Sequence, residues 1–121
     1  MKFLFVLTVS LVAVFAVEEY VTGHENFDAV ALVNDEKRLA EFTACYLDKG
    51  PCNEISSAFK NIASEVIREA CAKCSAKQKK MTKVYLDGIR VKLPQEYDEF
   101  KRKYDPENKY MEALYKVLDS A

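Results

Sequence analysis

The sequence predicts an all-α protein of about six amphipathic helices with two local disulfides. Apolar residues recur three and four positions apart instead of alternating, which is the spacing of one face of a helix. Only three glycines and three prolines interrupt the 121 residues. Four cysteines follow an apolar N-terminal segment, and an even number of cysteines in a small secreted chain favours disulfides.

The N-terminal segment has the form of a secretory signal peptide. Lys2 supplies a positive charge, residues 3–15 are almost wholly apolar, and Ala16 is a small residue suited to cleavage. The apolar run is shorter than the roughly 20 residues that a membrane-spanning helix needs. We therefore expect a signal peptide at 1–16 and a single helical domain at 17–121, secreted and extracellular, without stable membrane insertion.

The first two expected helices lie between residue 26 and the Gly50-Pro51 turn. Residues 26–28 have the composition of a helix start, and a short helix is expected from there to Val33. Asn34 and Asp35 are suited to cap a second helix, because their side chains accept hydrogen bonds from free backbone N–H groups. The inward face of this second helix consists of Leu39, Phe42 and Tyr46.

The third and fourth expected helices are the longest. The third runs from Glu54 to Ala70. Its apolar stripe consists of Ile55, Phe59, Ile62 and Val66. Ser75 and Gln78 have the form of a capping box, so a fourth helix is expected to open just after Cys74. Its inward residues are Met81, Tyr85, Leu86 and Ile89. The glycine at position 88 leaves the end of this helix open.

Two further helices complete the expected fold. Pro94 suits the first position of a fifth helix, which Asp105-Pro106 ends. One side of it carries Tyr97, Phe100 and Tyr104. A sixth helix follows, because apolar residues again recur at helical spacing. They are Met111, Leu114, Tyr115 and Leu118.

The four cysteines allow three disulfide pairings, and the sequence alone does not choose among them. Cys45 and Cys52 flank the Gly50-Pro51 turn, and Cys71 and Cys74 flank the junction of the third and fourth helices. We expect the two local pairs, 45 with 52 and 71 with 74, because a short turn brings each pair close.

Two other uses of the cysteines are less favoured. A redox Cys-x-x-Cys normally lies where a strand meets a helix, and no strand is expected around Cys71 and Cys74. A zinc site of four cysteines is disfavoured because six residues separate Cys45 from Cys52, where zinc ligand pairs usually have two to four.

The charge of the chain is balanced. Its 18 basic and 19 acidic residues leave a formal net charge of −1. Recognition of nucleic acid needs a clear basic excess on one face, so no nucleic-acid partner is expected. A cluster of lysines is expected to be the solvated face of a helix, with docking to an acidic membrane or a receptor as the alternative. The cluster consists of Lys77, Lys79, Lys80 and Lys83.

The cysteine spacing and its flanking residues resemble a known family. Six, eighteen and two residues separate successive cysteines. The stretches at 39–52 (LAEFTACYLDKGPC), 71–78 (CAKCSAKQ) and 103–106 (KYDP) are similar to motifs of the insect chemosensory proteins. These are four-cysteine secreted carriers of the olfactory-segment-D-like and ejaculatory bulb-specific-like type. The three motifs stand in the family's order, and the resemblance covers nearly all of residues 17–121.

The resemblance implies six helices around an apolar channel, bridges between neighbouring cysteines, and carriage of fatty acids, long-chain alcohols, esters or pheromone- and odorant-like semiochemicals. Residues 20–26 (YVTGHEN) depart from the family's Tyr-Thr-x-Lys-Tyr-Asp-Asn. His24 thus replaces a tyrosine that the family places near the channel mouth, and Tyr97 stands where the family often has tryptophan. The glycine at position 88 lies inside the expected fourth helix, so the shape of the channel there is open.

Eight inward residues are candidates for the wall of a binding site, with an ordinary helical core as the alternative for each. They are Leu39, Phe42, Tyr46, Ile62, Val66, Tyr85, Ile89 and Tyr97. The three tyrosines favour a cavity, because a buried hydroxyl needs a partner that water or a ligand head group supplies. The candidate disulfide cysteines are Cys45, Cys52, Cys71 and Cys74.

No catalytic constellation is visible. His24 is the one histidine, and the chain has no Ser-His-Asp set, His-x-x-His motif or glycine-rich phosphate loop. We expect a monomeric carrier of an apolar small molecule, with no enzymatic activity, cofactor or metal. The alternative is a secreted protein-interaction, developmental or salivary factor whose surface, including Lys79 and Lys80, binds a receptor or another protein.

Overall fold

The computed structural model describes residues 19–120, so the signal peptide expected at 1–16 lies outside the described residues. The described part contains six α-helices and no strand, which confirms the expected all-α class. The helices are α2 (Ala29–Asn34), α3 (Glu36–Tyr46), α4 (Glu54–Arg68), α5 (Ala76–Lys92), α6 (Pro94–Tyr104) and α7 (Met111–Asp119).

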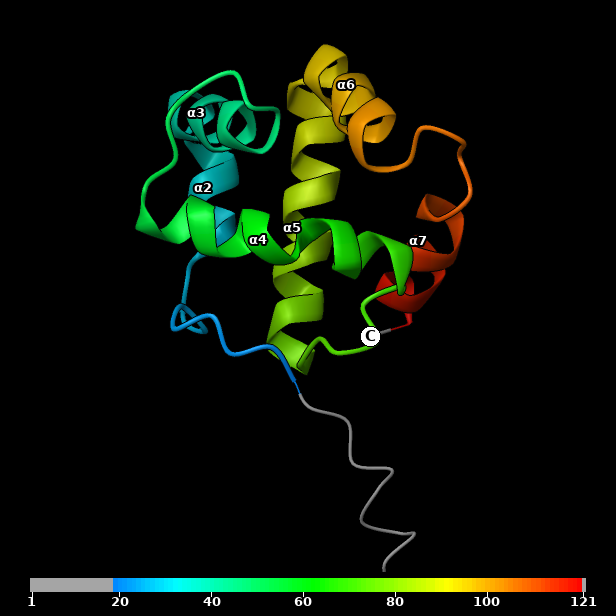
Figure 1. The fold of residues 1–121 in the computed structure, drawn as a ribbon. Helices are drawn as coiled ribbons and strands as arrows, with labels where there is room; N and C mark the ends of the chain where they lie inside the picture. The colour runs from blue at the N-terminus through cyan, green and yellow to red at the C-terminus, as the bar shows by residue number, and fades with distance from the viewer. Residues whose placement is uncertain (1–18, 121) are drawn as a thin grey trace, which may run out of the picture.

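The long helix α5 is the centre of the arrangement (Figure 1). It packs against α2 and α3 on one side and against α6 and α7 on the other, while α4 crosses in front of it and contacts α3, α6 and α7. The core therefore lies between α5 and the ring of shorter helices around it.

The helix starts follow from local capping chemistry. Asp28 accepts the N–H of Ala31 at 3.0 Å, so α2 begins at Ala29, just after the predicted start. Asp35 caps α3 in the same way. Asn53 and Ser56 form a reciprocal capping box at α4, and the capping box predicted from Ser75 and Gln78 is present at α5.

One helix end differs from the sequence expectation, and another had been left open by the sequence. Helix α4 ends at Arg68 and not at Ala70, because Ala70 and Cys71 take positive φ angles of 52° and 60° that a right-handed helix cannot contain. Helix α5 continues through Gly88 to Lys92. A Cβ at Gly88 would lie 2.6 Å from Val33 Cγ2, so this glycine permits the close contact of α5 with α2.

Helix α7 is capped by a residue outside it. Tyr110, its N-cap, makes no capping bond with its side chain. Instead, the buried carboxylate of Asp105 accepts the backbone N–H groups of Lys109, Tyr110 and Met111 at 2.7 to 3.0 Å. Burial alone would raise the pKa of Asp105, but these three donors outweigh it and the pKa is lowered. Asp105 thereby fixes the turn between α6 and α7.

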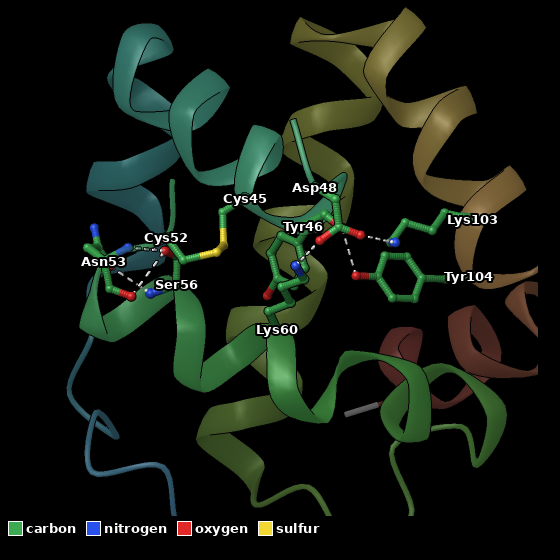
Figure 2. The surroundings of a disulfide bond; sticks show 9 residues. All are labelled: Cys45, Tyr46, Asp48, Cys52, Asn53, Ser56, Lys60, Lys103 and Tyr104. Carbon is green, nitrogen blue, oxygen red and sulfur yellow. Dashed lines mark hydrogen bonds and ion pairs between the residues drawn. A yellow bond between two sulfur atoms is a disulfide. The ribbon is translucent and has the colours of Figure 1, made fainter. Parts of the chain in front are cut away.

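Both disulfides are local, with the expected pairing of Cys45 to Cys52 and Cys71 to Cys74. Within the loop that the first bridge closes, Asp48 takes a positive φ of 59° and forms ion pairs with Lys60 and Lys103 (Figure 2). Hydrogen bonds from these two lysines hold the pKa of Asp48 at about 2. These two ion pairs therefore connect the loop after α3 to both α4 and α6.

Candidate functional site

The centre of the core is a cluster of aromatic rings from several helices. The Tyr46 ring lies 5.5 Å from that of Phe42, 5.3 Å from that of Tyr85 and 5.7 Å from that of Phe100, between ring centroids. Phe42 in turn stacks on Phe27 at 5.8 Å. Helices α3, α5 and α6 therefore meet through aromatic contacts, whose tilted and edge-on geometries are favourable.

A cavity of about 80 Å³ lies beside this cluster. Its wall is contributed by α2 to α6 together with Phe27 and Cys74, and none of the described side chains that line it carries a charge. Pockets that hold small-molecule ligands usually measure about 300–1,000 Å³. A long alkyl chain therefore fits only if lining side chains move apart.

Five of the eight predicted wall residues line this cavity. They are Phe42, Tyr46, Ile62, Val66 and Tyr85. The other three, Leu39, Ile89 and Tyr97, are buried outside it. Leu39 and Ile89 are fully enclosed in the core, and the hydroxyl of Tyr97 meets that of Tyr115 on α7 at 2.7 Å. These three contribute to packing between helices in this structure.

The sequence-based prediction omitted several residues of the wall. Some had been assigned inward positions but no place in the site: Phe59, Met81, Leu86 and Phe100. Others are small, polar or outside the stripes: Phe27, Ala29, Leu32, Ala63, Ile67, Cys74, Gln78 and Thr82. Helical spacing would have found Ala63 and Ile67, which flank Ile62 and Val66 on the same turns of α4. No local signal marks Gln78 or Thr82 as part of an apolar wall.

Most polar groups at the cavity already have partners. Gln78 donates to the carbonyl of Tyr20 at 2.9 Å and accepts the N–H of Ser75 at 2.9 Å. Thr82 Oγ1 donates to the Gln78 carbonyl at 2.7 Å. The Tyr85 hydroxyl lies 2.8 Å from Thr43 Oγ1, and burial raises the pKa of Tyr85 well above its usual value. These groups close hydrogen bonds within the protein.

A second hollow, of about 520 Å³, runs along α3 and the loop before α4. It shares Phe27, Leu32 and Phe42 with the cavity, but its rim includes the exposed side chains of Arg38 and Glu41. Its walls are thus partly charged and solvent-facing. The smaller cavity is the better candidate for an apolar ligand, because its wall is apolar and largely buried.

The segment before α2 closes one side of the cavity. The ring of His24 lies 6.4 Å from that of Phe59, which lines the cavity. Phe27 also contacts Phe59, at 5.7 Å between ring centroids. His24 therefore lies behind the cavity wall, next to one of its residues, and its role at an entrance stays a prediction.

The sequence model of the insect pheromone-binding family, A10/OS-D, matches residues 20–112. The chain belongs to this family. The resemblance to chemosensory proteins is thereby confirmed, and A10/OS-D proteins are binding proteins and not enzymes. The chain is 28% identical to Ejaculatory bulb-specific protein 3 of Drosophila melanogaster over 122 residues, which cover all of the chain and 97% of that relative.

Two further comparisons agree with the A10/OS-D assignment. Allergen Tha p 1 of Thaumetopoea pityocampa is 30% identical over 103 residues, covering 85% of the chain and 82% of the relative. A solved chemosensory protein in complex with bromo-dodecanol has the same fold, with a TM-score of 0.73 at 20% identity, over 85% of this chain and 100% of the other. Among the described residues, no helix combines the length and apolarity needed to cross a membrane.

Proposed function

We propose that this A10/OS-D protein is a secreted, extracellular carrier that encloses an apolar small molecule between α2, α3, α4, α5 and α6. The observation that carries the proposal is the cavity, whose described wall is apolar and holds no charged side chain. Fatty acids, long-chain alcohols, esters and related semiochemicals are the ligand classes that such a wall suits. The similar solved structure, a complex with bromo-dodecanol, supports an alkyl ligand.

Binding by this site requires the cavity to expand. Phe59, Ile62 and Met81 line it and are only half-buried, so they have room to turn outward. Methionine is unbranched and adapts to irregular spaces at low cost. Each methylene of a ligand that enters contributes about 0.8 kcal/mol, which offsets the cost of separating the side chains of the wall.

Displacement of an uncharged fluorescent naphthylamine probe from purified protein tests the carrier. Competitors are straight-chain alcohols of increasing length, below their micelle concentrations. Affinity should rise about fourfold per methylene, because 0.8 kcal/mol corresponds to that factor, until the expanded cavity is full. Equal affinity for short and long alcohols refutes burial in an apolar cavity. Failure of the folded protein to bind the probe refutes the carrier and favours the surface-interaction alternative.

A further inference from the structure

The hydroxyl of Tyr46 is a polar group of the cavity that has no hydrogen-bond partner among residues 19–120. Tyr46 is the last residue of α3, and its side chain is 8% exposed. Its backbone is held, because its carbonyl accepts the Tyr104 hydroxyl at 2.8 Å. Figure 2 shows the Tyr46 hydroxyl on the side of the ring opposite Tyr104. No hydrogen bond joins that hydroxyl to any side chain or backbone group of residues 19–120.

The surroundings of Tyr46 indicate where its hydroxyl points. Within the described residues, every fully enclosed side-chain nitrogen or oxygen has a hydrogen-bond partner. Because the Tyr46 hydroxyl has none, its oxygen borders accessible space, and the space that Tyr46 lines is the cavity. The hydroxyls of Thr43 and Tyr85, by contrast, are joined to each other at 2.8 Å. No group of residues 19–120 accepts from the Tyr46 hydroxyl, which can therefore donate to a ligand in the cavity.

The electrostatics of the cavity favour an uncharged partner for this donor. Burial, with a smaller contribution from Tyr85 and Tyr104, raises the pKa of Tyr46 well above its usual value, so the hydroxyl keeps its proton. No lysine, arginine, histidine, aspartate or glutamate lines the cavity within residues 19–120. An ionised carboxylate or ammonium group buried there would have no counter-ion, and such burial is costly.

We propose that the Tyr46 hydroxyl is the head-group anchor of the cavity and selects ligands that end in an uncharged oxygen, such as an alcohol, aldehyde or ester, over ionised fatty acids and amines. The proposal rests on the proposed carrier function and narrows its ligand class. The alkyl chain supplies most of the affinity, whereas the hydrogen bond from Tyr46 supplies the discrimination between head groups.

The test compares the wild type with Tyr46→Phe and with the matched control Tyr110→Phe. Tyr110 is half-buried, does not line the cavity, and has no side-chain hydrogen bond to the described residues. Displacement of the naphthylamine probe by dodecanol gives the ratio of dodecanol affinity to probe affinity for each protein. This ratio should fall about threefold to tenfold in Tyr46→Phe, equivalent to about 0.7–1.4 kcal/mol, and stay unchanged in Tyr110→Phe.

The same assay at pH 7 with dodecanoate and dodecylammonium tests the charge selection. Both should bind the wild type at least tenfold more weakly than dodecanol, since their chain is equally long and their head group is charged. An unchanged ratio in Tyr46→Phe, or dodecanoate binding as tightly as dodecanol, overturns the anchor while leaving the carrier intact. Absence of probe binding by the folded wild type refutes the carrier, and the anchor with it.

Infrared spectroscopy detects the hydrogen bond between the Tyr46 hydroxyl and the ligand directly. The infrared carbonyl stretch of bound, ¹³C-labelled dodecyl acetate should lie at lower frequency in the wild type than in Tyr46→Phe, because a hydrogen bond from the hydroxyl weakens the C=O bond. An identical carbonyl frequency in the two proteins contradicts the proposed contact, even if the affinity ratio changes.

Discussion

Replacement of Gly88 by alanine tests whether the contact between α5 and α2 is as close as the structure has it. Alanine favours a helix interior over glycine by about 1 kcal/mol, so an isolated α5 would become more stable. In the folded protein, the new Cβ would lie 2.6 Å from Val33 Cγ2 and 2.8 Å from Val33 Cγ1. Ordinary carbon contacts are about 3.5–4.0 Å, so the two helices have to separate by roughly 1 Å.

The cost of the contact between the new Cβ and Val33 should exceed the stability gained from the higher helix propensity of alanine. Val33 is β-branched and has one strongly preferred rotamer in a helix, so its methyl groups cannot turn away cheaply. Overpacking of this kind costs about 1–3 kcal/mol. Gly88→Ala is therefore expected to destabilise the protein by about 1 kcal/mol net, after the gain in propensity is subtracted.

Urea unfolding followed by far-UV circular dichroism, with both disulfides intact, measures this change. The matched variants are Val33→Ala alone and the double variant Val33→Ala/Gly88→Ala. Removing the methyl groups of Val33 should relieve the clash, so Gly88→Ala in that background should be neutral or stabilising. If Gly88→Ala by itself raises the free energy of unfolding by about 1 kcal/mol, the close contact of α2 with α5 is refuted.

Two further predictions concern acid stability and the cavity. The pKa of Asp48 falls from about 3.9 in the unfolded chain to about 2 in the folded protein, so its stabilising contribution is present above about pH 5 and is lost as the pH falls towards 2. The difference in urea midpoint between the wild type and Asp48→Asn should therefore shrink as the pH falls from about 5 to about 2. A difference that stays constant down to pH 2 contradicts this prediction. Ala63→Leu adds bulk to the cavity wall and should weaken binding of the apolar probe about tenfold, whereas Ala113→Leu on the exposed face of α7 should not. Equal binding by the two leucine variants, measured by probe titration, shows that the ligand lies elsewhere.

The sequence predicted the helices well because their signals are local. The capping box of Ser75 and Gln78 is present, and Pro94 does begin α6. The same holds for the two disulfides, since each joins cysteines across one short turn. The prediction was wrong where a backbone conformation decided the outcome, as at Ala70, whose positive φ ends α4 early.

The candidate site was predictable only in part. Helical spacing identifies which side of each helix faces inward, and this placed Phe42, Tyr46 and Tyr85 at the cavity. It does not distinguish inward residues that meet another helix from those that border a gap. Leu39 and Tyr97 share stripes with cavity residues, yet they fill the interfaces between helices.

The helical class, the helix starts, the disulfide framework and the family of this protein could all be inferred from the order of its residues, because each depends on residues within a few positions of one another. Three features could be found only in the folded chain: Gly88 meets Val33, Asp105 caps α7, and the Tyr46 hydroxyl has no hydrogen bond to another of the residues 19–120. A cavity and its free hydrogen-bond donor arise where the faces of several helices fail to fill the space between them. That mismatch depends on how the helices pack, and no single segment contains it.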